Sequence, residues 1–247
     1  MTINQEPTPK TTETPQKMLI EANKARESAD FLGGLDLALV ASSLFKKDGE
    51  LPKAAEALSS AAISLRHLYE NKRDSAYLSL ALQIAQDAVD LAMQSGQKDA
   101  LAIPYFELAK TQETAGQLYA ASLTYEKAFE HIITNPPKSH DRPGVKADIT
   151  GRLAISRIKV GEEEALKDFN QALEDLEQSK EGDYNKGVWL SGLHMHLAEA
   201  LKDKDTKNAR EHLQEARRLI DIYSLPLRLN QWQRLADTFP PKDLQVA

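Results

Sequence analysis

The sequence predicts an all-α protein, and three observations support this. Alanine and leucine recur at spacings of three and four residues along most of the chain, which is the spacing of one helical face. The alternation of apolar and polar residues typical of strands is missing. Prolines and glycines fall between the periodic segments or at their starts. Together these observations predict consecutive helices joined by short turns.

The first 17 residues differ from the rest of the chain. They hold three prolines, five threonines and two apolar side chains. Such a segment buries too little apolar surface to offset its chain entropy, so we expect residues 1–17 to form a disordered tail. The segment has neither the apolar stretch of a secretory signal nor the arginines of a mitochondrial presequence, which predicts a cytoplasmic protein.

The periodic segments after this tail predict eleven helices. Pro52 stands at the start of one helix, where its missing N–H costs no hydrogen bond. Pro104 must lie in the first turn of its helix or kink it. The expected helices are 18–31, 35–47, 51–71, 75–95, 98–115, 117–133, 144–160, 162–179, 186–202, 205–222 and 227–237.

Short connections make consecutive helices antiparallel neighbours. We therefore expect a single domain over residues 18–247, built from hairpins and closed by a capping helix at 227–237. The expected hairpins are 18–47, 51–95, 98–133, 144–179 and 186–222.

A repeated residue pattern marks the second helix of each hairpin. An alanine lies about four residues after the start of that helix, at separations of 43, 40, 44 and 44 residues. These alanines are Ala38, Ala81, Ala121, Ala165 and Ala209. Four residues later stand Ser42, Ala85, Tyr125, Phe169 and Leu213, and seven residues later Phe45, Ala88, Ala128, Ala172 and Ala216. These positions share one helical face, where small residues let a neighbouring helix approach closely.

The first helix of each hairpin carries its own mark. A leucine lies 12 or 13 residues before the alanine in hairpins two to five, at Leu68, Leu108, Leu153 and Leu197. Gly34, Gly116 and Gly161 stand where we expect the turn inside three of the hairpins.

This pattern resembles the tetratricopeptide repeat (TPR), most clearly over residues 100–220. The first matching copy is Leu108, Ala109, Gly116, Ala121, Tyr125 and Ala128, and the second is Leu153, Ala154, Gly161, Ala165, Phe169 and Ala172. A weaker copy is Leu197, Ala198, Ala209, Leu213 and Ala216. The period of about 43 residues exceeds the 34 of standard units, so the chain is similar to the long-helix variants of that family.

The resemblance implies a right-handed superhelical solenoid of five stacked hairpins. It also implies a concave groove, lined by the first helix of each hairpin, that binds a peptide or helix of a partner protein. The corresponding groove positions are Arg66, Glu70 and Arg73, then Phe106, Lys110 and Glu113, then Met195, Glu199 and Lys202. In the fourth hairpin the same rule gives an apolar patch of Gly151, Ile155 and Ile158.

One ligand known for this family does not fit these positions. Some TPR proteins clamp a carboxyl terminus with an asparagine two residues after the marker leucine. Those positions here hold Glu70, Lys110, Ile155 and Glu199.

Composition and motifs argue against several function classes. Acidic residues number 37 and basic residues 31, and the net charge of −6 speaks against direct nucleic-acid binding. No apolar run reaches the 18 residues of a membrane-spanning helix. The absence of cysteine removes disulfides, zinc ribbons and thiol nucleophiles. No phosphate-binding or nucleophile motif occurs, so we expect no catalytic residue, no cofactor and no enzyme activity.

The histidines do not form a metal motif. His194 and His196 are two residues apart, so on a helix they point about 200° from each other and cannot hold one ion. His196 and Glu199 share a face, which is more typical of a surface hydrogen bond. We therefore expect no metal site.

Three functions remain open at this stage. The leading prediction is a non-catalytic adaptor that binds a protein or peptide in the groove. The alternative is a structural subunit of a larger multiprotein or ribonucleoprotein assembly. The third is an all-helical enzyme, which would need buried titratable groups in a closed pocket. The sequence identifies neither the partner nor the oligomeric state.

Overall fold

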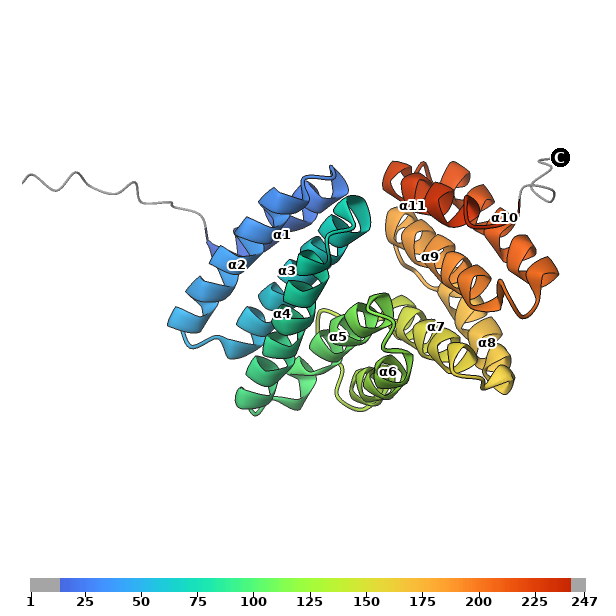
Figure 1. Cartoon of the computed structure of the whole chain (residues 1–247). Coiled ribbons are helices and arrows are strands. Elements are labelled where there is room, and N and C mark those ends of the chain that lie inside the picture. The colour runs from blue at the N-terminus through green and yellow to red at the C-terminus, as the bar shows by residue number, and fades with distance from the viewer. Residues whose placement is uncertain (1–13, 241–247) are drawn as a thin grey trace, which may run out of the picture.

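The computed structural model describes residues 14–240, a range that contains helices and turns and no strand (Figure 1). Eleven α-helices follow one another within it, which confirms the predicted class. They are α1 Pro15–Glu27, α2 Phe31–Lys47, α3 Leu51–Lys72, α4 Ser75–Gln94, α5 Ala102–Thr114, α6 Leu118–Thr134, α7 Pro143–Lys159, α8 Leu166–Gln178, α9 Asp183–Leu201, α10 Thr206–Ile222 and α11 Pro226–Ala236. Short 3₁₀ turns, η1 Lys98–Ala100 and η2 Glu163–Ala165, precede α5 and α8.

Consecutive helices pack in pairs, and each pair stacks on the next. The pairs are α1 with α2, α3 with α4, α5 with α6, α7 with α8, and α9 with α10, while α11 packs on the last pair. Figure 1 shows the stack following a curved path, so that the first helices and the last helices come to lie near each other. This curvature gives the molecule an inner and an outer side.

The repeated alanines form the contacts between helices, as the sequence predicts. The side chains of Ala38, Ala81, Ala121 and Ala209 have no exposed surface, and that of Ala165 is 5% exposed. The larger residues between them, Tyr125 and Phe169, are also fully buried. Small side chains at these positions allow neighbouring helices to come close, and the large ones fill the remaining space.

The first turn differs from the prediction. Residues 28–30 form it, so Gly34 lies inside α2 and not at a turn. The Asp30 carboxylate accepts a hydrogen bond of 2.9 Å from the Gly33 N–H, which starts α2 four residues earlier than expected. A Cβ atom at Gly34 would lie 3.1 Å from the carbonyl oxygen of Ala22, so this glycine serves the close approach of α1 and α2.

The other two glycine turns are confirmed. Gly116 and Gly161 have φ angles of 74° and 103°, in the left-handed region that favours glycine, and they follow α5 and α7. Pro104 is the third residue of α5 and therefore lies in its first turn. Most of the predicted tail lies outside the described residues, and residues 15–17 form the start of α1, which Thr14 caps.

Two histidines join α9 and α10. The Nδ1 atoms of His194 and His212 are 2.8 Å apart, and both rings meet the buried ring of Phe169 edge-on. Burial, together with the neighbouring His212, lowers the pKa of His194 to about 4. The pair is therefore neutral near pH 7 and shares a single hydrogen bond.

The tight alanine contacts predict that a larger side chain will not fit. Replacing Ala121 with leucine should lower the free energy of unfolding by about 1–3 kcal/mol, because the extra atoms push α5 and α6 apart. The matched control is Ala120→Leu, one residue earlier on the exposed side of α6, which should change stability by less than about 0.5 kcal/mol. Urea unfolding followed by circular dichroism measures both. Equal effects of the two substitutions would contradict this packing.

The histidine pair predicts that stability falls in mild acid. His194 titrates near pH 6.5 in the unfolded chain and near pH 4 in the folded protein, so between these values the unfolded state binds more protons. The stabilisation that neutral His194 provides should therefore be fully present above about pH 6.5. The free energy of unfolding should fall by about 3 kcal/mol as the pH drops to about 4. Urea unfolding of the wild type and His194→Gln at several pH values should show a flatter pH dependence in the variant. Parallel curves would contradict the prediction.

Candidate functional site

One groove of about 750 Å³ runs along the inner side of the stack. Its walls come almost entirely from α3, α5, α7, α9 and α11, that is, from the first helices of pairs two to five and the last helix. The resemblance to TPR proteins predicts this use of the first helices. Charged, aromatic and aliphatic side chains all contribute to the lining.

Most of the predicted groove residues line this cavity. They are Arg66, Glu70, Arg73, Lys110, Glu113, Met195 and Glu199. Phe106 does not, because its side chain is 6% exposed and packs edge-on against Tyr125 inside the hairpin. Lys202 also lies outside the groove, with its ammonium group over the ring of Phe239.

The apolar patch predicted for the fourth hairpin is wrong. Ile155 and Ile158 are buried in the core, and a Cβ atom at Gly151 would lie 2.9 Å from the side chain of Leu193. These residues therefore form the contact between α7 and α9. The face of α7 that lines the groove is therefore shifted by about one residue from the expected positions.

A charged face of α7 lines the groove in place of that patch. Its members are Asp148, Arg152 and Lys159, spaced four and seven residues apart. Charged residues with this spacing were the available sequence signal, because they share one side of the helix.

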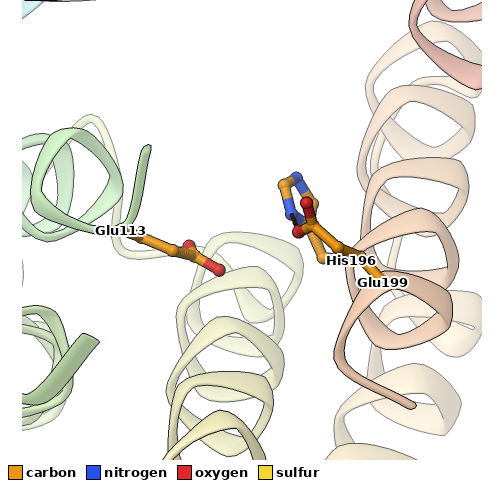
Figure 2. Close-up of side chains that lie close together, drawn as sticks. All are labelled: Glu113, His196 and Glu199. Atoms are coloured by element: carbon orange, nitrogen blue, oxygen red, sulfur yellow. Dashed lines mark ion pairs between the residues drawn. The ribbon is translucent and has the colours of Figure 1, made fainter. Parts of the chain in front are cut away.

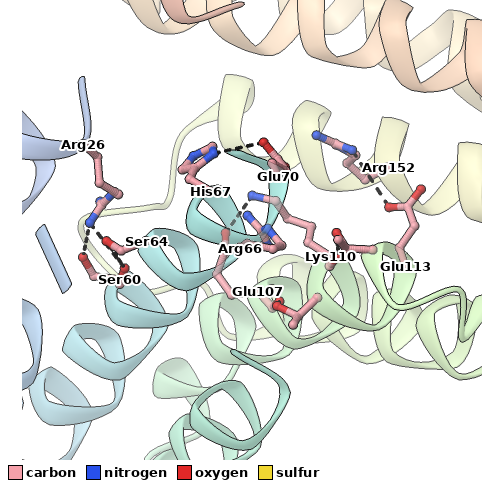
Figure 3. Close-up of polar contacts among 12 residues, drawn as sticks. Arg26, Ser60, Ser64, Arg66, His67, Glu70, Glu107, Lys110, Glu113 and Arg152 are labelled. Carbon is pink, nitrogen blue, oxygen red and sulfur yellow. Dashed lines mark hydrogen bonds and ion pairs between the residues drawn. The ribbon is translucent and has the colours of Figure 1, made fainter. Parts of the chain in front are cut away.

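A buried ion-pair network connects α3 and α5 (Figure 3). Glu107 accepts hydrogen bonds from Arg66 Nη1 at 3.1 Å and from Lys110 Nζ at 2.8 Å. Burial alone would raise the pKa of Glu107, but the two cations lower it to about 2. Glu107 therefore remains charged at neutral pH and fixes both cations at the groove wall.

A second network joins α5, α7 and α9. Lys159 Nζ donates to Glu113 Oε1 at 2.8 Å and to Glu199 Oε2 at 2.7 Å, and the Tyr125 hydroxyl donates to Glu113 Oε2 at 2.8 Å. Burial would raise the pKa of Glu113, but Lys159 and other nearby cations hold it well below its usual range. Tyr125 of the repeat motif thus connects the hairpin core to the groove.

Among the described residues, Glu113, His196 and Glu199 form the group that most resembles a metal site (Figure 2). One ligand atom from each lies within 4.8 Å of the others, and zinc accepts such ligands. Lys159, however, already donates to both carboxylates. Its ammonium group supplies the positive charge that these carboxylates require, so the arrangement is an internal ion-pair network. Burial and the nearby Arg152 lower the pKa of His196 well below its usual value.

The last helix closes one end of the groove. Gln231 Nε2 donates to Glu70 Oε2 at 3.1 Å, and Arg234 Nη1 donates to Asn71 Oδ1 at 3.0 Å. Leu227 packs against the core between α2, α3 and α4. Figure 1 shows α11 near the end of α3, although these contacts join residues more than 160 positions apart.

Sequence reasoning identified α11 only as a cap. Trp232 fulfils that role, since its Nε1 donates to the Leu213 carbonyl at 2.8 Å. Three polar residues of the same helix, Arg228, Gln231 and Arg234, face the groove. Their spacing of three residues gave a sign of a second face, but nothing in the sequence indicates that this face meets α3.

Comparisons with known proteins support the fold. No protein-family profile matches the sequence, and no curated protein matches it. Among solved structures, the chain is similar to the nearly identical TPR-like repeats of a chain designated a kinesin light chain from Podosopora anserina. The TM-score is 0.52 at 14% identity, and the match covers 92% of this chain and 100% of the other. The fold is TPR-like. At this identity the likeness concerns the fold alone.

None of the helices in the described range is both long and apolar enough to cross a membrane.

The contacts between α3 and α11 predict a closed groove in solution. The chain has no cysteine, so Lys72→Cys and Asn230→Cys, both exposed, give two specific spin labels. We expect one narrow distance distribution by double electron–electron resonance. Gln231→Ala with Arg234→Ala should broaden and lengthen it, because losing two hydrogen bonds of about 1 kcal/mol each favours the open form about 30-fold. Gln233→Ala, which bonds only within α11, is the control. An unchanged distribution in the double variant would contradict the closure.

Proposed function

We propose that this chain is a non-catalytic adaptor of the long-helix TPR type that binds a short peptide segment of a partner protein in its groove. The supporting observation is that five helices line one cavity. Four of them are the first helices of four repeats, and the fifth is α11. A site built from so many sequentially separate elements is positioned by the whole solenoid. Extended concave surfaces of this kind are the usual binding surfaces of repeat proteins.

The size and lining of the groove indicate the kind of segment. Its volume of about 750 Å³ lies within the range of about 300–1,000 Å³ found for ligand pockets. The contacts of α11 with α3 limit its length. Trp189, Met195 and Val188 provide apolar surface beside the charged residues. A few extended residues with mixed apolar and charged side chains match this space better than a complete helix does.

Three glutamates at the groove favour binding over catalysis. A general acid or base works best with a pKa near the operating pH. The pKa values of Glu70, Glu107 and Glu113 are all lowered despite burial, by hydrogen bonds and by neighbouring cations. Each of these carboxylates is held in hydrogen bonds or ion pairs within the protein. They therefore support the shape and charge of the groove.

A structural-subunit function is favoured by a different observation. The outer helices α4 and α6 expose large apolar side chains, including Tyr119 at 75%, Leu123 at 62% and Met93 at 58%. Such residues on the convex side suit contact with a further protein.

Peptide display against the full-length protein tests the adaptor function. Selected peptides should bind with an affinity that Arg73→Glu, an exposed change at the groove, weakens at least about tenfold, or about 1.4 kcal/mol. The matched control is Lys207→Glu, the same charge reversal on the exposed side of α10, which should bind as the wild type does. Fluorescence anisotropy measures both.

Peptides that bind both variants equally would place the contact outside the groove. If Leu123→Glu then abolished binding, the convex side would be the interaction surface, and the structural-subunit function would replace the adaptor.

A further inference from the structure

We propose that Arg152 and Arg228 form a subsite for a phosphate group inside the groove. The inference rests on the proposed function, because it names the chemistry that the groove ligand presents. The two guanidinium groups come from α7 and α11, and both line the cavity.

The groove is cationic although the chain is acidic overall. Seven arginine and lysine side chains line it, against four aspartates and glutamates. The whole chain carries a net charge of −6. A local surplus of positive charge that is partly removed from water is unfavourable unless an anion neutralises it. The groove is therefore complementary to an anionic ligand.

Most cations inside the groove already have carboxylate partners. Arg66 and Lys110 share Glu107, and Lys159 bridges two glutamates. Arg234 lies 3.8 Å from a carboxylate oxygen of α3. Three arginines of the lining remain. Arg73 is exposed at the end of α3, whereas Arg152 and Arg228 lie inside the groove and carry the surplus charge there.

Arg152 is buried without hydrogen bonds. Its side chain is 8% exposed, and none of its nitrogens donates a hydrogen bond to a residue in the described range. Its Nη1 lies 4.0 Å from Glu113, whose carboxylate is already bound by Lys159 and Tyr125. Figure 3 shows the Arg152 side chain extending from α7. One guanidinium nitrogen is directed toward Glu113, and another is directed away from it. A buried guanidinium with unused donors requires an acceptor.

Arg228 has no carboxylate within ion-pair distance in the described range. Its Nη1 donates to Gln231 Oε1 at 2.7 Å. Burial and the neighbouring charge of Arg152 lower the pKa of Arg228 to about 10, so it stays charged at neutral pH. A Cβ atom at Gly192 would lie 3.3 Å from Arg228 Nη2, so this glycine lets the guanidinium lie close to α9.

Asp148 is the acid that acts on both arginines. In the described structure it forms no ion pair and no side-chain hydrogen bond, and its side chain lines the groove. Burial raises its pKa. Tyr125, Glu113 and Asp148 raise the pKa of Arg152 despite its burial, so Arg152 stays charged, and the need that remains is an acceptor for its N–H donors.

The chemistry of these groups favours phosphate over a carboxylate. A guanidinium binds oxyanions through parallel N–H donors, and two of them provide more donors than the two oxygens of a carboxylate can use. A phosphate monoester has a charge of about −1.5 to −2 at pH 7 and three acceptor oxygens. It therefore matches both the surplus charge and the number of free donors.

Thermal unfolding of the full-length protein tests the subsite. Inorganic phosphate at pH 7 should raise the melting temperature by about 3 °C with saturation, relative to sodium chloride or sodium acetate at equal ionic strength. Arg152→Gln and Arg228→Gln should abolish this rise. Arg218→Gln, the same substitution at an exposed arginine of α10, should keep it.

The variants also separate binding from folding. Without phosphate, Arg228→Gln should melt at or above the wild-type temperature, because it removes a buried charge that the neighbouring Arg152 destabilises. If Arg228→Gln fails to fold, Arg228→Lys keeps the charge without the paired donors and should respond to phosphate less than the wild type. A wild-type phosphate response in folded Arg152→Gln and Arg228→Lys would overturn the proposal. An equal response of the wild type to acetate would overturn it as well.

Peptide libraries identify the source of the phosphate. A degenerate library with a central phosphoserine should bind more tightly than the same library with serine, and inorganic phosphate should compete. If phosphate stabilises the protein but neither library binds, the subsite binds a small phosphate compound, and the proposed peptide-binding function is wrong. If unphosphorylated peptides bind in the groove but phosphate has no effect, the adaptor function stands and the subsite fails.

Discussion

The close contact of helices at alanine is the constraint on which the rest of this structure depends. Each pair of helices touches only its neighbours along most of the stack, so no central core compensates for a poor contact. Ala38, Ala81, Ala121 and Ala209 are fully buried because a larger side chain would separate the helices that they join. These contacts set the distance between successive pairs. Repeated five times, they also set the curvature that brings the inner faces of the first helices together.

That curvature explains why the inner side is built from ion pairs. Apart from α11 at one end, no helix in residues 14–240 covers the first helices there, so many of their inner residues are polar, and several of these are buried by the curvature. Isolated surface pairs contribute about 0–1 kcal/mol, whereas loss of one partner from a buried pair costs about 3–5 kcal/mol. Glu107 and Glu113, both nearly inaccessible, are the buried anions around which Arg66, Lys110 and Lys159 are arranged. The groove is thus preorganised before any ligand binds.

The same enclosure makes the unpaired arginines informative. Most buried charges here have partners at hydrogen-bond distance, and Arg152 and Arg228 lack a carboxylate at that distance. Two cations that line the same groove without a carboxylate at hydrogen-bond distance are unfavourable for folding, and a bound anion would offset this cost. The position of α11 supports the same inference. Its contacts with α3 place Arg228 at the groove, and they require the whole stack to be folded.

The sequence by itself determined the local structure. Period and composition specify each helix and which face packs, since these depend on residues within one or two turns, and the resemblance to TPR proteins pointed to Arg66 and Lys110, which line the groove. Tertiary structure decided the rest. The rotation of α7 follows from the close packing of Gly151 against Leu193 of α9. A rule based on residue spacing holds no information about that contact. The meeting of α11 with α3 depends on the summed curvature of all the repeats. Small changes in each pair accumulate over more than 160 residues, so only the folded chain shows that Arg228 belongs to the groove.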